Sequence, residues 1–327
     1  MSIDNSQEVL ILTGAGFTKN FGGFLAEEMW SQIFNSPHIQ HSPYLRSILQ
    51  DNFDFESVYS EVMDNPQVSE IDKDSLQQAI LLAYKQLDEI VRAWIFNSGS
   101  RYPVNWYGFT DLLTQIHPHG RGQGYFFTLN QDLFLERRLR YHSPGTPRFP
   151  NDFYTPGNQP FKSTDFVTLH NDNLANRVLT DIKNHTGIVY IKLHGSYGWQ
   201  ASTGGKQLVI GKNKSSLIDA EPLLQCYMNI FKTVIAEGNK KILIIGYGFM
   251  DEHINQVLTH GIVNHGLKVF ILNPQGPSQL KERMPHYAKS IFDGLSGYFP
   301  YSLLQVFPSD QSDTIELNTI KESLLKN

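Results

Sequence analysis

Short, unbroken apolar runs constrain the fold of this chain more than any other feature. The first occupies residues 9–12 (VLIL), and similar runs occupy residues 125–129, 188–193, 241–245 and 267–272. An apolar run without alternation is typical of a strand buried on both faces of a sheet. Long helical or irregular segments separate the runs, as they do in parallel α/β proteins. We therefore predict an α/β fold with a parallel sheet flanked by helices.

The composition fits a folded protein. The chain has 327 residues and a formal charge of −5, which argues against a basic nucleic-acid-binding protein. Aromatic residues make up 12%, far more than a disordered chain carries. Cys226 is the only cysteine, which excludes a disulfide framework and a zinc site made of cysteines. Because no signal-peptide pattern or membrane-length apolar run occurs, we expect a soluble, cytoplasmic protein without direct membrane contact.

The segments between the apolar runs suggest how one domain over residues 1–327 is organised. Residues 74–96 carry an apolar stripe at helical spacing, and we expect residues 25–115 to form a helical insertion. Residues 143–165 contain five prolines and two glycines, which predicts a long ordered loop or lid. Residues 276–327 form a C-terminal extension after the last apolar run.

A glycine loop, Gly14-Ala15-Gly16, follows the first apolar run directly. Glycines at this position let the backbone approach a pyrophosphate, and the N-terminus of the following helix favours negative charge. The dinucleotide-binding fingerprint requires a third small residue, but Lys19 stands there instead. The loop alone is therefore compatible with nucleotide binding and with a plain tight turn.

Three further motifs follow later apolar runs: TLNQD at 128–132, LHG at 193–195 and GYGFMDEHIN at 246–255. With the glycine loop, and in this order, they resemble the sirtuin fold, which is Rossmann-like. The last motif is most similar to that of divergent bacterial sirtuin-like domains in anti-phage defence systems. The resemblance extends over about residues 8–274.

Two departures from sirtuin deacylases change the function that the resemblance implies. Deacylases carry a module with four zinc-binding cysteines, which a chain with one cysteine cannot form, and we expect no metal site in its place. The segment after the glycine loop, residues 21–25 (FGGFL), also lacks the arginine found in deacylases. Both departures fit the defence-type members, which resemble NAD hydrolases.

The resemblance implies roles for individual residues. Asn130 would lie beside the ribose and the nucleophile, Asp132 would contact the nicotinamide amide, and His194 would act as general base. A histidine suits that task because its unperturbed pKa lies near 6.5. The residues expected to bind NAD are Gly14, Ala15, Gly16, Phe17, Asn130, Asp132, Ser196, Gly246, Tyr247 and Asn273.

Purely structural roles remain open for the same positions. Asn130 could be a turn residue, Asp132 a helix N-cap, and His194 a buried core histidine. For Asp251, His253 and Asn255, capping and helix packing are the favoured interpretation.

The predicted function is hydrolysis of NAD+ to nicotinamide and ADP-ribose, with NAD as substrate, in abortive infection. Such an activity must be kept off until triggered, so we expect a homo-oligomer or a separate partner such as a HerA-like ATPase or an Argonaute-like protein. A sensor within this chain is not expected, because about 50 residues follow the last clear strand. Two alternatives stay open: a protein deacylase or ADP-ribosyltransferase, and a non-catalytic module that binds NAD or ADP-ribose.

Overall fold

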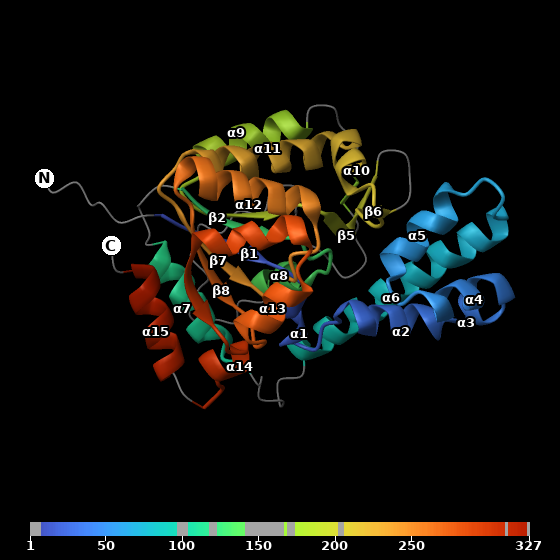
Figure 1. Cartoon of the computed structure of the whole chain (residues 1–327), viewed down its shortest axis with the longest axis horizontal. Helices are drawn as coiled ribbons and strands as arrows, with labels where there is room; N and C mark the ends of the chain where they lie inside the picture. Colours follow the sequence, from blue (N-terminus) through green and yellow to red (C-terminus); the bar gives the residue numbers. More distant parts are fainter. Residues whose placement is uncertain are drawn as a thin grey trace, which may run out of the picture.

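A six-stranded parallel sheet forms the centre of the protein (Figure 1). The structure is a computed structural model that describes residues 8–96, 104–117, 123–140, 167–168, 174–201, 206–310 and 313–325. The strand order is β4-β2-β1-β7-β8-β9, and every neighbouring pair is parallel. The strands are β1 (Val9–Thr13), β2 (Gln123–Thr128), β4 (Gly187–Lys192), β7 (Lys241–Ile245), β8 (Lys268–Leu272) and β9 (Leu295–Phe299). This arrangement confirms the predicted Rossmann-like α/β fold.

The central strands bury both faces, which explains their unbroken apolar sequences. In β1, Leu10 and Leu12 point to one side, whereas Val9 and Ile11 point to the other. The first side is covered by α9 (Leu174–Asn184), α11 (Pro222–Ala236), α12 (Glu252–His265), α13 (Pro277–Arg283) and the 3₁₀ helix η1 (His286–Gly294). The second side is covered by α1 (Ala15–Lys19), α7 (Trp106–Ile116), α8 (Phe134–Arg140), α14 (Leu303–Val306) and α15 (Ile315–Leu325).

A helical lobe stands beside the sheet and occupies most of the predicted insertion (Figure 1). It consists of α2 (Ala26–Phe34), α3 (Pro37–Gln40), α4 (Pro43–Asp51), α5 (Phe55–Asp64) and α6 (Glu70–Phe96). The predicted helix over 74–96 begins four residues earlier, because Ser69 Oγ accepts a hydrogen bond from the backbone N–H of Asp72 (3.1 Å). The remaining helix of this region, α7, lies beside α15 under the sheet rather than in the lobe.

The rest of the chain adds a small second sheet and completes the first. The second sheet contains β3 (Val167–Thr168), β5 (Gly195–Gln200) and β6 (Lys206–Leu208), and α10 (Lys214–Ala220) follows it. The predicted extension over 276–327 supplies β9, the edge strand of the central sheet. The predicted loop over 143–165 lies outside the described residues. In the described part of the chain, no helix has the length and apolar character needed to cross a membrane.

Candidate functional site

All four sequence motifs lie at the carboxyl edge of the central sheet. The strand order runs outward from β1 through β2 to β4 and, on the other side, from β7 to β8 and β9. The direction of the order therefore reverses between β1 and β7. Ligands of open α/β sheets bind beyond the carboxyl ends of the strands at such a reversal. The glycine loop follows β1 and Gly246 follows β7, so both sit at this point.

The glycine loop interlocks with the loop that follows β7. Gly14 N donates to Ile245 O (3.1 Å), and Gly16 N donates to Gly246 O (2.9 Å). Gly246 has φ +63°, and a Cβ atom there would lie 2.4 Å from Phe17 N. The glycines at 14, 16 and 246 are thus required by the contact of two backbones. Gly246 faces the glycine loop, and its contribution to binding is to hold that loop in place.

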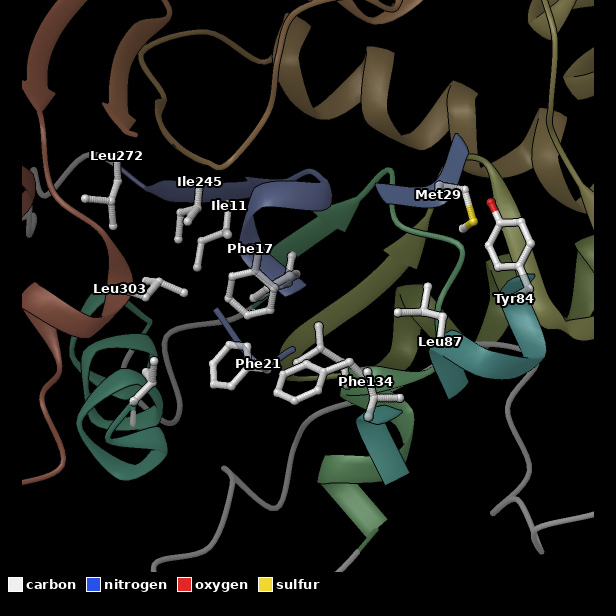
Figure 2. Packing of buried hydrophobic residues seen from close by; sticks show 14 of the residues in the cluster. Ile11, Phe17, Phe21, Met29, Tyr84, Leu87, Phe134, Ile245, Leu272 and Leu303 are labelled. Atoms are coloured by element: carbon white, nitrogen blue, oxygen red, sulfur yellow. The ribbon is translucent and has the colours of Figure 1, made fainter. Parts of the chain in front are cut away.

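Two expectations about the glycine loop are changed by the structure. The helix that follows it, α1, has only five residues, so its dipole adds little favourable charge. The Phe17 side chain is buried in the core, where Figure 2 shows it together with Phe21 and Phe134. Phe17 can therefore offer a ligand only its backbone. Ala15, at the tip of the loop, is exposed.

Asn130 connects the β2 edge to the glycine loop. Its Nδ2 donates to Gly14 O (2.9 Å) and to Thr18 Oγ1 (3.0 Å). Its backbone N–H donates to Thr128 Oγ1 (3.1 Å), which also accepts from Thr13 Oγ1 (2.8 Å). These contacts hold the half-buried amide across two loops, so its role exceeds that of a residue in a local turn.

Asp132 lies close to Asn130 in the chain and has the helix-cap role that was one of its two predictions; contact with nicotinamide stays a prediction. Its Oδ1 accepts from the backbone N–H of Phe134 at the start of α8 (2.9 Å), as in a helix cap. Burial raises the pKa of the Asp132 carboxyl, although the ammonium of Lys192 and a hydrogen bond from Thr18 oppose that shift. Thr18 therefore contacts both Asn130 and Asp132, and sequence reasoning did not identify it.

Lys192 forms a buried ion pair with Glu136 next to Asp132. It is 1% exposed, pairs with Glu136 of α8 (2.7 Å) and also donates to the Asp132 carbonyl. Buried ions persist only when they are paired in this way. The pair fixes the start of α8 against β4.

His194 is buried at the end of β4 and contacts a second histidine. Its Nε2 lies 2.9 Å from Nε2 of His253, at the start of α12. Burial, together with the positive charge of Lys214, lowers the pKa of His194 to about 3. The adjacent Gly195 has φ +78°, and a Cβ there would lie 2.3 Å from Gln207 O. The glycine of the LHG motif therefore lets β6 pass close behind His194.

A chain of charged groups continues from the two histidines. Asp251 lies at the N-cap position of α12, yet its side chain makes no capping hydrogen bond. Instead its carboxylate binds Lys214 Nζ (2.6 Å), which also binds Glu56 of α5 (2.7 Å). Burial raises the pKa of Asp251, but His194 and Lys214 outweigh it and hold that pKa below its usual range.

The cluster of His194, Asp251 and His253 was not predicted from the sequence. Ligand atoms of the three residues lie within 4.8 Å of one another, as in a candidate metal site. Burial lowers the pKa of His253 to about 4. In the sequence, one signal could have suggested the contact between His194 and His253. His253 stands two residues after Asp251, just past the loop that leaves the same sheet edge.

The remaining predicted residues make local hydrogen bonds, and the NAD-binding roles of Ser196, Tyr247 and Asn273 stay predictions. The Tyr247 hydroxyl donates to Asn255 Oδ1 (3.0 Å), and Asn255 Nδ2 donates to Phe249 O (2.7 Å), which fits the packing role expected for Asn255. Ser196 is fully buried and accepts from Gly198 N (3.2 Å). Asn273 Oδ1 accepts from Gln275 N (3.0 Å) in the loop after β8.

Comparison with known proteins gives one family. The model of the SIR2-like domain matches residues 124–291, more than half of the chain. The match contains Asn130, Asp132, His194 and the loop after β7, whereas the glycine loop lies before it. No curated protein matches the chain.

Proposed function

The chain belongs to the SIR2-like domain family, and on that premise we propose that it hydrolyses NAD+ to nicotinamide and ADP-ribose. SIR2-like domains bind NAD and are often NAD-using enzymes. The observation that carries the proposal is the position of the Asn130 amide. It bridges the glycine loop and the TLNQD motif at the strand-order reversal, with Asp132 beside it.

The reaction needs three contributions from the protein. The bond between C1′ of the ribose and the nicotinamide nitrogen breaks, and its electron pair leaves with nicotinamide. Positive charge develops on the ribose, water adds at C1′, and a proton is released. The site must therefore orient the nicotinamide, tolerate positive charge at the ribose and accept a proton.

The donor set of the site fits the two ends of this substrate. In our proposal the carboxyl of Asp132, whose pKa is raised by burial, contacts the nicotinamide amide. The half-buried Asn130 amide, held by Gly14 and Thr18, orients the ribose and the attacking water. The exposed Ala15 at the tip of the glycine loop leaves room for the pyrophosphate.

His194 is assigned the role of proton acceptor. With its pKa lowered to about 3, the ring is neutral throughout the physiological range and carries a free electron pair. A neutral ring also adds no positive charge next to the developing ribose cation. The proposed role of His194 as the base toward a ribose hydroxyl or water rests on its place in the LHG motif at the end of β4, because a low pKa keeps the ring unprotonated but weakens it as a base.

Hydrolysis is favoured over acyl transfer by the cysteine content. Cys226 is the only cysteine, and it lies buried on α11. The four-cysteine zinc module of sirtuin deacylases therefore cannot form. The proposal extends to depletion of NAD+ as an effector of anti-phage defence, which the GYGFMDEHIN motif supports. Activation would then come from self-assembly or from a separate HerA-like or Argonaute-like partner.

Nicotinamide release by the purified chain tests the proposal. Asn130→Ala and His194→Ala should each lower release by about 100-fold or more, the scale of a positioned acid or base. Asn264→Ala changes an exposed residue of α12 and should retain activity. Undiminished release by both site variants would reject the assignment, and NAD binding without any release would favour a non-catalytic module.

A further inference from the structure

We propose that His253 is a positioning residue for His194, held in place by Asp251 and Lys214 and connected through Glu56 to the helical lobe. The inference rests on the proposed function, because it assigns His194 as the base. It adds a residue of α12 to the site and a link from α5 to that site.

The contact between the two rings carries the proposal. The Nε2 atoms are 2.9 Å apart, so one nitrogen must donate and the other accept. The ring tautomers are therefore complementary, and the orientation of each ring depends on the other. A proton taken up by His194 is then shared with His253 and lies close to the Asp251 carboxylate.

The far side of His253 offers this proton a route to solvent. His253 is half-buried and borders a groove of about 640 Å³ between α10, α11 and α12, which Asp219 and Lys232 also line. The ring thus lies between buried His194 and an open surface. A histidine in this position can pass a proton from His194 to solvent. A residue used only for packing has no such function.

Asp251 and Lys214 form the charged surroundings of His253, and a carboxylate oxygen of Asp251 lies within 4.8 Å of the ligand nitrogens of both histidines. The Lys214 ammonium lies 2.6 Å from Asp251 and 2.7 Å from Glu56, so one cation bridges two carboxylates. The charged groups that face His253 are Asp251 on its own loop, Lys214 on α10 and Lys232 on α11. Glu56 acts on this set through Lys214.

The helical lobe holds Lys214 through more than one contact. Ser60 Oγ of α5 accepts from Lys212 N (2.7 Å), and a Cβ at Gly211 would lie 2.5 Å from the same oxygen. The segment from Gly211 to Lys214 is therefore packed against α5. A movement of α5 relative to the sheet would change the partners of Lys214 and so the restraint on His253.

A bound metal is the competing explanation for this cluster. Two imidazoles on one tetrahedral zinc ion stand roughly 3.3 Å apart at zinc–nitrogen distances of about 2.0–2.1 Å. The observed 2.9 Å is a hydrogen-bond distance, and Asp251 Oδ1 already binds an ammonium that would repel a second cation. The geometry therefore favours a hydrogen-bonded pair.

Steady-state kinetics test the positioning role. In His253→Gln and Asp251→Asn, kcat should fall by roughly 10- to 100-fold, part of what a positioned base contributes, while KM stays within about threefold. The pH dependence of kcat should shift in both variants, and Glu56→Gln should have a smaller effect. His260→Gln is the matched control, because His260 is an exposed residue of α12 with its own histidine contact, to His265 (3.3 Å). Equal kcat and pH profile in His253→Gln and wild type would overturn the proposal.

Nitrogen NMR of histidine-labelled protein tests the same contact without NAD. We expect complementary tautomers for His194 and His253 at pH 7, and a changed Nε2 shift of His194 in His253→Gln. An unchanged His194 spectrum would overturn the pairing. So would binding of one zinc ion per chain that is lost in His253→Gln. Failure of the proposed function would instead appear as intact NAD+ with wild-type protein while the NMR coupling persists.

Discussion

At the scale of single residues, the site contains two kinds of constraint. Gly14, Gly16 and Gly246 are explained by backbone contact, since any side chain there would collide with the opposite loop. Asn130 and His194 are different, because backbone contact does not explain them. Burying an amide or an imidazole costs free energy unless its polar atoms find partners. Their polar contacts cross between loops. The chemistry is therefore best sought in these two residues.

Gly246→Ala tests the backbone contact. The new Cβ would lie 2.4 Å from Phe17 N at a φ of +63°, so we expect a loss of roughly 1–3 kcal/mol of stability and weaker NAD binding. Gly248→Ala is the control, because its Cβ would meet nothing nearer than Met250 Cγ at 4.0 Å. Equal stability of the two variants in denaturant titration would contradict the interlocked loops.

The pH dependence of hydrolysis tests the state of His194. Because its pKa is lowered to about 3, the neutral ring persists well below the usual histidine range. We therefore expect that histidine protonation does not lower kcat/KM between pH 8 and pH 5. The measurement is kcat/KM against pH for wild type. An acid limb centred near 6.5 that disappears in His194→Gln would show that the ring titrates normally.

At the scale of elements, the sequence predicts best where burial is complete. The apolar runs at 9–12, 125–129, 188–193, 241–245 and 267–272 coincide with β1, β2, β4, β7 and β8 to within one or two residues. A strand buried on both faces has few residue types to choose from, which makes it recognisable. Because all these strands are parallel, their following loops had to converge at one edge.

Other elements were not predictable from pattern alone. The edge strand β9 (LSGYF) is mostly part-exposed and contains Gly297, so it lacks an apolar run. The contact of His194 with His253 joins residues 59 positions apart. It depends on the direction in which α12 leaves the loop after β7, which no local signal specifies.

The capping of α5 is a testable property of the helical lobe. Asp54 Oδ1 accepts from the backbone N–H groups of Glu56 (3.1 Å) and Ser57 (3.3 Å). Asp54→Ala should destabilise the protein by about 1 kcal/mol, and Asp51→Ala, an exposed residue at the end of α4, by much less. Denaturant unfolding followed by circular dichroism measures both. A larger loss in Asp51→Ala would contradict the capping role.

At the scale of the whole molecule, the histidine pair links the site to stability. The unfolded chain binds protons on His194 and His253 near pH 6.5, whereas the folded chain binds them only near pH 3 and 4. Between these limits the unfolded state holds more protons. Folding stability must therefore fall as the pH falls through this window.

The histidine pair should consequently account for part of the acid sensitivity. Each of the two histidines lowers the free energy of unfolding by up to about 1.4 kcal/mol for each pH unit of acidification between pH 6.5 and its folded pKa. The free energy of unfolding of the double variant His194→Gln, His253→Gln should vary less between pH 6 and 4.5 than that of wild type. Equal slopes would mean that the two rings take up protons in the folded state as readily as in the unfolded chain.

The proposed reaction breaks the bond between nicotinamide and ribose, and water adds at C1′ of the ribose. The most direct measurement is a mass balance of NAD+ incubated with the wild-type chain, read by proton NMR. We predict that NAD+ disappears while nicotinamide and ADP-ribose accumulate in equal amounts, without an acylated peptide. Nicotinamide release that requires an acylated peptide, or NAD+ that binds and stays intact, would contradict NAD+ hydrolysis by this chain.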